Sequence, residues 1–281
     1  MQVQRFLFLV CMLLWGWLFP IVSFAGYPQV ASSDLSALSA VLTETESAGP
    51  VAVRTKTVYF ISGLAADKRL FNNVTLPANI KVKHVEWLEP KKAEALESYC
   101  RRLATQIDTS SDFSLVGISF GGMVAVEMNK FLKPEKTILI SSITTSQNMP
   151  AFYRFVSKWN VHKIVPHWVY KRFYQGAYWF FDPQTREQKD LIVALMDNAS
   201  ENLLTWSIDQ LVSWKNEFKP ENAVIIAGNK DRVFPHKKLS PDRIIPGGTH
   251  MMVYDKGSEV SQVLDEVLNE PSGTNIAAIT E

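Results

Sequence analysis

The 281-residue sequence has little of several features that mark whole classes of protein. Its two cysteines, Cys11 and Cys100, are too few for a disulfide framework. Its net charge is only +1 and it has no basic stripe interleaved with aromatic residues, which argues against a nucleic-acid partner. It has no internal repeat and no metal-ligand cluster, so we expect neither metal nor cofactor. Apolar residues are abundant, at 47%, which is enough to bury the core of one globular domain.

The first 25 residues differ in composition from the rest of the chain. Arg5 is their only charged residue, and Phe6 to Phe24 is almost wholly apolar. Ser23-Phe24-Ala25 offers small residues where a signal peptidase reads, so we expect a secretory signal cleaved after Ala25 and an exported protein, periplasmic or secreted. The alternative is an uncleaved anchor that holds the protein at a membrane, because the apolar run approaches the length of a bilayer span.

The rest of the chain predicts one α/β domain between two irregular ends. Residues 26–53 are small and polar and predict a linker, and residues 271–281 predict a flexible tail. Between them, at 54–270, short apolar strands alternate with helical segments. This alternation predicts a mostly parallel sheet of about six strands flanked by helices.

An insertion rich in aromatic residues interrupts the domain. Roughly 80 residues separate a strand at 136–141 from a strand at 223–227, far more than a crossover helix requires. We therefore expect a helical cap at about 145–218. Most of its aromatic side chains would pack the cap onto the sheet, and an apolar cap above a polar site would suit an acyl chain or an aromatic group.

Residues 91–107 predict an amphipathic helix that covers the sheet. Apolar and aromatic residues recur at helical spacing, at Leu96, Tyr99, Cys100, Leu103 and Ile107. Charged residues are expected to point outward from the same helix, and these are Glu94, Glu97, Arg101 and Arg102.

A serine stands between glycines where a strand should meet a helix, in Gly117-Ile118-Ser119-Phe120-Gly121-Gly122. An apolar strand at 113–116 precedes it, and a helical segment at 123–128 follows. A serine in so sharp a turn is driven into an unfavourable backbone conformation and projects its hydroxyl from the end of the sheet. The pattern predicts a nucleophile at Ser119 and an oxyanion-binding N–H at Phe120. An ordinary glycine-rich turn is the alternative.

A serine hydroxyl is a poor nucleophile at neutral pH, so a histidine must take its proton and a carboxylate must orient that histidine. The strand at 223–227 is followed by a loop at 228–235 that contains Asp231. A carboxylate in that place lies at the edge of a parallel sheet where ligands bind. We predict Asp231 as the acid, although many aspartates in such loops are only turn residues.

The histidine is expected after the next strand, at 243–245. Gly247 and Gly248 precede His250 and allow a loop tight enough to bring its imidazole back over the same edge. His236 is closer to the acid in sequence, but two lysines follow it, which is typical of a solvated loop. We predict His250 as the base.

A second oxyanion donor is expected in the loop that leaves the strand at 57–61. This loop reads Ser62-Gly63-Leu64-Ala65-Ala66-Asp67, and its glycine permits close approach of a backbone. We predict the N–H of Leu64 as the donor. Asp67 is expected to cap the next helix, and contact with a polar substrate group is the alternative.

With these motifs the chain resembles the α/β-hydrolase superfamily, and more narrowly its bacterial single-domain members of the serine hydrolase or esterase type, with a Ser-Gly-Leu-x-Ala-Asp loop. The resemblance covers about residues 55–270. It implies the same nucleophile, acid, base and oxyanion donors: Ser119, Asp231, His250, and the N–H groups of Leu64 and Phe120. Two departures stand out. Ser62-Gly63 replaces the His-Gly of many members, and the first strand pair of the larger sheets is missing.

The sequence thus predicts an enzyme that cleaves a small apolar or aromatic carboxylic ester, or a thioester, through an acyl-enzyme. One alternative keeps the same residues for acyl transfer or for cofactor-free C–C hydrolysis. Another is a non-catalytic binding protein, against which a complete set of three residues argues. Serine at the turn also argues against dehalogenase or epoxide hydrolase chemistry, which needs a carboxylate nucleophile there.

Overall fold

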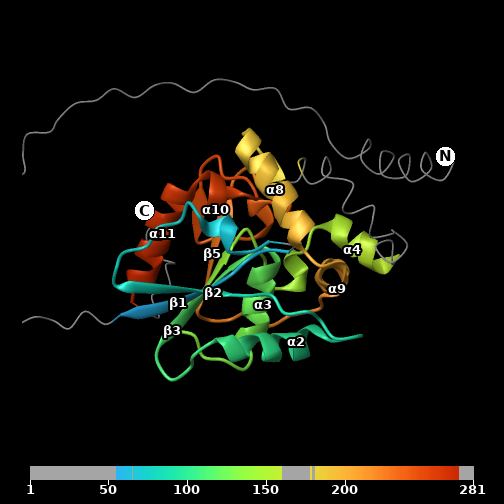
Figure 1. Ribbon diagram of the computed structural model, residues 1–281, viewed down its shortest axis with the longest axis horizontal. Coiled ribbons are helices and arrows are strands. Elements are labelled where there is room, and N and C mark those ends of the chain that lie inside the picture. The colour runs from blue at the N-terminus through green and yellow to red at the C-terminus, as the bar shows by residue number, and fades with distance from the viewer. Residues whose placement is uncertain (1–54, 65, 160–177, 179–180, 272–281) are drawn as a thin grey trace, which may run out of the picture. The chain divides into compact units, whose positions relative to one another are not determined.

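The computed structural model describes residues 55–271 except for 65, 160–177 and 179–180 (Figure 1). The expected signal or anchor, the linker, and all but the first residue of the expected tail lie outside the described residues. No helix in the part that the structure describes is long and apolar enough to cross a membrane.

Six strands form one parallel sheet in the order β2-β1-β3-β4-β5-β6, which confirms the predicted fold class. Their bounds are β1 (Lys56–Ile61), β2 (Ile80–Val85), β3 (Phe113–Ile118), β4 (Thr137–Ile140), β5 (Ala223–Gly228) and β6 (Arg243–Ile245). The motifs did not predict β2, because Lys81 and Lys83 interrupt its apolar run. Charged residues of this kind are common on an edge strand, which is where β2 lies.

Helices cover both faces of the sheet because successive strand residues point to opposite sides. On β1, Tyr59 and Ile61 face the core that contains α2 (Leu96–Leu103) and α3 (Phe120–Asn129). Val58 and Phe60 face the core on the other side. That core contains the short helices η1 (Lys68–Phe71) and α10 (Met252–Asp255) together with α11 (Gly257–Asn269) (Figure 1). Asp67 accepts a hydrogen bond from the N–H of Arg69 at the start of η1, which confirms it as a cap.

Helices make up much of the described part of the segment between β4 and β5, as expected of a cap. It contains η3 (Ser146–Asn148), α4 (Ala151–Lys158), α8 (Arg186–Asn198) and α9 (Glu201–Ser213). Thr185 and Gln188 form a reciprocal capping box that begins α8. Ser200 accepts from the N–H of Leu203 and begins α9. Two further single-turn helices are η2 (Ala104–Gln106) and η4 (His236–Lys238).

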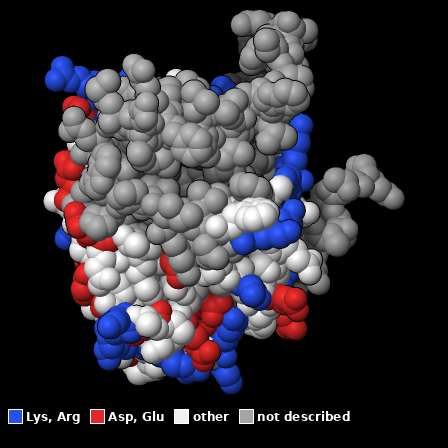
Figure 2. All heavy atoms as spheres, turned by 90° about the vertical axis from the view of Figure 1, so that its right-hand side faces the viewer, with Lys and Arg blue, Asp and Glu red and all other residues white. Residues whose placement is uncertain are grey.

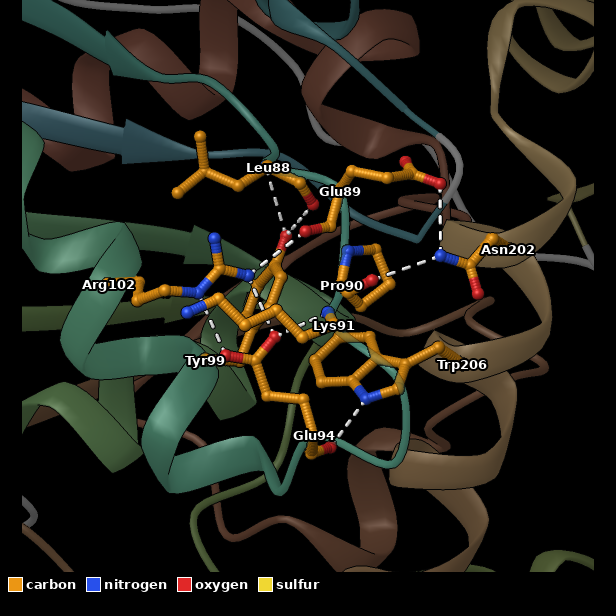
Figure 3. Close-up of polar contacts among 9 residues, drawn as sticks. All are labelled: Leu88, Glu89, Pro90, Lys91, Glu94, Tyr99, Arg102, Asn202 and Trp206. Carbon is orange, nitrogen blue, oxygen red and sulfur yellow. Dashed lines mark hydrogen bonds and ion pairs between the residues drawn. The ribbon is translucent and has the colours of Figure 1, made fainter.

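The predicted helix at 91–107 is shorter than expected, and Glu94 does not point outward. Helix α2 begins only at Leu96, because Ala93 takes a positive φ of 53° and the preceding residues form a turn. The Glu94 side chain is 3% exposed, accepts from the Lys91 N–H at 2.8 Å and pairs with Arg102 at 2.7 Å (Figure 3). Glu97 is exposed as expected and pairs with Arg101 one turn along the helix.

Charged side chains of both signs lie next to one another along the lower part of the face shown in Figure 2. This mixing fits the net charge of +1.

Candidate active site

The structure brings Ser119, Asp231 and His250 together at the carboxyl edge of the sheet. Ser119 directly follows β3, Asp231 lies in the loop after β5, and His250 follows β6. His250 Nε2 lies 2.9 Å from Ser119 Oγ. Its Nδ1 lies 3.0 Å from Asp231 Oδ2 and 3.2 Å from Oδ1. The three groups form one continuous hydrogen-bonded chain, although 131 residues separate the serine from the histidine.

The backbone of Ser119 is held in an unusual conformation, with φ 52° and ψ −120°. A positive φ at a residue other than glycine costs about 1–3 kcal/mol and persists only where its surroundings fix it. Here the Ser119 N–H donates to the carbonyl of Ile140 at 3.0 Å, and the Ser142 hydroxyl donates to the Ser119 carbonyl at 2.6 Å. The neighbouring strand β4 and the loop after it therefore fix the backbone conformation of the turn.

Two glycines of the turn are required by close packing. A Cβ on Gly117 would lie 2.4 Å from the Gly121 carbonyl oxygen, and a Cβ on Gly121 would lie 2.2 Å from the Ser62 carbonyl oxygen. Neither distance is tolerable for carbon against oxygen. The strand, the turn and the loop after β1 can approach only because both side chains are absent.

The loops that carry the acid and the histidine are joined by hydrogen bonds. The Lys230 N–H donates to the Gly248 carbonyl at 2.9 Å, and the Gly247 N–H donates to Asn229 Oδ1 at 2.7 Å. These bonds place the two loops beside each other. They explain how residues after separate strands bring their side chains into contact.

Asp231 is held as a carboxylate. Burial would raise its pKa. The charge of His250 and the hydrogen bond with it outweigh this effect, together with a bond from the Phe234 N–H, and the pKa lies below its ordinary value. The nearby Ser141 hydroxyl adds to this lowering, although it makes no hydrogen bond of standard geometry. Oδ1 accepts from the N–H groups of Val233 and Phe234 at 2.8 and 3.0 Å. An ionised carboxylate in this place favours the histidine tautomer with its proton on Nδ1.

The loop after β1 lies against the serine. A Cβ on Gly63 would lie 3.5 Å from Ser119 Cβ, so the loop and the turn are in direct contact there. Leu64 follows in a turn closed by a bond from the Ala66 N–H to the Gly63 carbonyl at 3.1 Å. Among the described residues, no acceptor pairs with the N–H of Leu64 or of Phe120, which is what a donor to a ligand atom requires.

Comparison with known proteins gives the fold. No protein-family model and no curated protein matches the sequence significantly. Among solved structures, MenH from S. aureus is similar with a TM-score of 0.59 and 18% identity over 76% of this chain and 93% of its own. Bromoperoxidase from Bacillus anthracis is similar at 0.58, with 16% identity over 76% and 92%. The esterase EaEST from Exiguobacterium antarcticum is similar at 0.55, with 16% identity over 76% and 92%.

The chain has the α/β-hydrolase fold. Its sheet has six parallel strands, and the loop after the third strand in sequence carries the serine turn. The resemblance found in the motifs is thereby confirmed for the fold, over the share of the chain that these structures cover.

Aromatic rings surround His250 in this α/β-hydrolase fold. Phe181 stacks on the imidazole with centroids 5.6 Å apart and an interplanar angle of 17°. Phe234 lies 5.9 Å away at 57°, and Tyr153 of α4 packs on Phe234 at 6.2 Å. Phe181 and Tyr153 come from the inserted segment, so the cap covers the site with apolar surface. His236, the rejected candidate, lies in η4, and the Asp231 carboxylate pairs with His250 instead.

Sequence reasoning missed the residues that support the site from a distance. Ser142 holds the serine turn, and Trp87 donates to Ser62 Oγ at 2.9 Å beside the predicted oxyanion donors. The cap segment at 160–177, which includes His162, His167 and several expected aromatic residues, lies outside the described residues. The aromatic richness of the cap was the one signal that pointed towards the rings around His250.

Proposed function

We propose that the protein is a serine hydrolase that cleaves a carboxylic ester with a small apolar or aromatic acyl group. The observation that carries this proposal is the continuous chain from Ser119 Oγ through His250 to Asp231, at 2.9 and 3.0 Å. A serine, a histidine and a carboxylate in this order provide a nucleophile, a base and a group that orients the base. The esterases among the structural neighbours support the same class of reaction.

The geometry supports the following steps. His250 Nε2 takes the proton from Ser119 Oγ as the oxygen attacks the ester carbonyl carbon. The N–H groups of Leu64 and Phe120 bind the oxygen that becomes negative, each donor being worth about 3 kcal/mol in comparable sites. The tetrahedral adduct collapses as His250 returns the proton to the leaving alcohol. Water then attacks the acyl-serine with the same histidine as base, and the carboxylic acid is released.

The surroundings support an apolar acyl group. Phe181, Phe234 and Tyr153 lie over or beside the imidazole, and Trp206 of α9 packs against Phe120 with centroids 6.2 Å apart. Aromatic walls with a few convergent polar groups are typical of small-molecule sites. Apolar walls also exclude water, which strengthens the interaction of the donors with the developing charge.

The test is hydrolysis of p-nitrophenyl esters of increasing chain length, together with labelling by a fluorophosphonate probe. We expect esterase activity and labelling from the protein, and neither from Ser119→Ala. Ser114→Ala is the matched control, because it removes another buried serine hydroxyl, from the strand that directly precedes Ser119. Undiminished turnover by a folded Ser119→Ala variant would refute the assignment.

A further inference from the structure

Trp87 contacts the loop that contains Leu64 and the side chain of Phe120, the two residues predicted as oxyanion donors. Its indole Nε1 donates to Ser62 Oγ at 2.9 Å and to the Ala66 carbonyl at 3.0 Å, which are the two ends of the loop that contains Leu64. Its ring stacks on Phe120 with centroids 5.8 Å apart and an interplanar angle of 29°. One side chain therefore bonds to the loop of the first donor and packs on the residue that supplies the second.

The indole completes the closure of that loop. The Ser62 hydroxyl donates to the Ala66 carbonyl at 2.7 Å, and the Ala66 N–H donates to the Gly63 carbonyl at 3.1 Å. These two bonds close the loop across Leu64. The Nε1 proton lies between the serine oxygen and the carbonyl, so it binds both acceptors at once and fixes the orientation of the hydroxyl.

Trp87 is itself rigidly placed, because both of its chain neighbours are held by paired hydrogen bonds. Gln106 accepts from the Glu86 N–H and donates to its carbonyl, each at 2.9 Å. The Tyr99 hydroxyl accepts from the Leu88 N–H at 3.1 Å and donates to its carbonyl at 2.7 Å (Figure 3).

The segment after Leu88 is fixed as well, and it reaches the cap. Figure 3 shows Trp206 of α9 pointing towards Glu94, whose carbonyl accepts from the indole N–H at 2.7 Å. Asn202 donates to the Pro90 carbonyl at 3.1 Å. A side chain anchored from both directions can hold a loop, whereas a side chain on a mobile segment would move with it.

We propose that Trp87 is a positioning residue that aligns the N–H groups of Leu64 and Phe120 on the oxyanion. The inference rests on the proposed function, since it assigns a partner to the two donors of that reaction. Donors that are held in advance at the position of the developing oxyanion bind the transition state more strongly than the bound ester. Loss of the indole N–H should therefore lower kcat and leave KM nearly unchanged.

The test compares Trp87→Phe with Trp214→Phe. Both variants are expressed from the full-length sequence and purified in the form that the cell produces. Phenylalanine keeps a ring against Phe120 but removes the indole N–H. Trp214 is the matched control, because its indole N–H donates to Glu127 Oε1 at 2.8 Å, near the end of α3 opposite to Phe120. The readouts are kcat and KM for a p-nitrophenyl ester, the rate of fluorophosphonate labelling, and the melting temperature.

We expect Trp87→Phe to lower kcat and the labelling rate about 10- to 100-fold, a part of the effect of deleting a donor. Trp214→Phe should change kcat and the labelling rate less than about 3-fold, while its melting temperature falls by a similar amount to that of Trp87→Phe. This is the result expected of a purely structural indole bond. If Trp87→Phe does not fold, Ser62→Ala removes the loop's side of the same contact, and a loss of kcat with unchanged KM is again expected.

Three outcomes separate this inference from the proposed function. Labelling and turnover that survive Ser119→Ala would overturn the proposed function and this inference with it. Labelling that requires Ser119 but proceeds equally in the two tryptophan variants would overturn only the role of Trp87. A rise in KM with unchanged kcat would also overturn it, because it would assign Trp87 to ester binding.

Discussion

Replacement of Asp231 by asparagine should inactivate the protein without unfolding it. The Oδ1 atom of Asp231 accepts from the N–H groups of Val233 and Phe234, so the amide oxygen of an asparagine must take that place. Its NH₂ group then occupies the place of Oδ2, 3.0 Å from His250 Nδ1. A donor facing Nδ1 forces the imidazole proton onto Nε2. A protonated Nε2 can no longer take the proton of Ser119. Loss of the correct tautomer costs about 10⁴-fold in kcat, or about 5 kcal/mol.

The assay is the initial rate of p-nitrophenyl ester hydrolysis beside a thermal melt. Asp255→Asn is the matched control, because Asp255 is a second aspartate nearby, partly buried, that accepts from the Thr249 hydroxyl at 2.7 Å. Burial raises the pKa of its carboxyl, so a neutral amide should be tolerated there. We expect melting temperatures within a few degrees of the parent for both variants. A loss below about 10-fold in Asp231→Asn would refute the tautomer argument.

Two further predictions follow from the turn and from the ion pair of α2. In Gly121→Ala the added methyl would lie 2.2 Å from the Ser62 carbonyl oxygen, so we expect lost activity and a lower melting temperature; unchanged activity would contradict the packing. The Arg102 guanidinium lowers the pKa of Glu94 from 4.5 to about 2. The pair therefore stabilises the fold above about pH 4.5, and this contribution is lost as the pH falls towards 2. Glu94→Gln should be less stable than the parent at pH 7 in urea unfolding, and the gap should narrow below pH 4.5; a constant gap would argue against the pair.

The parallel sheet could be predicted because its central strands are buried on both faces. Residues 113–118 contain one polar side chain, Ser114, and residues 223–228 contain none, and such runs admit few other structures. The edge strand β2 escaped prediction because one of its sides faces water and carries lysines. The start of α2 was misplaced for a different reason. Glu94 has a side chain typical of a helix surface, but its carboxylate is bound by Arg102 and by the backbone of Lys91.

That Ser119, Asp231 and His250 lie together could be predicted because each follows a strand of a parallel sheet, and the carboxyl ends of such strands meet at one edge. Their supports could not. Trp87 and Ser62 are 25 residues apart, and Ser142 and Ser119 are 23 apart. Nothing local in the sequence links either pair. A hydrogen bond between two such residues depends on strand order and register, which only the folded chain supplies.

The strand order also explains why the oxyanion loop and the serine turn are neighbours. From β1 the chain moves outward to the edge strand β2, and then returns across β1 to form β3 on its other side. The direction of the order reverses between β1 and β3, and at such a point the loops from adjacent strands diverge and leave a crevice. Leu64 follows the first of these strands and Ser119 the second. The predicted donors and Ser119 therefore lie where the strand order reverses, and the topology leaves room for a ligand there. Under the proposed function, the inserted helices α4, α8 and α9 would select the acyl group.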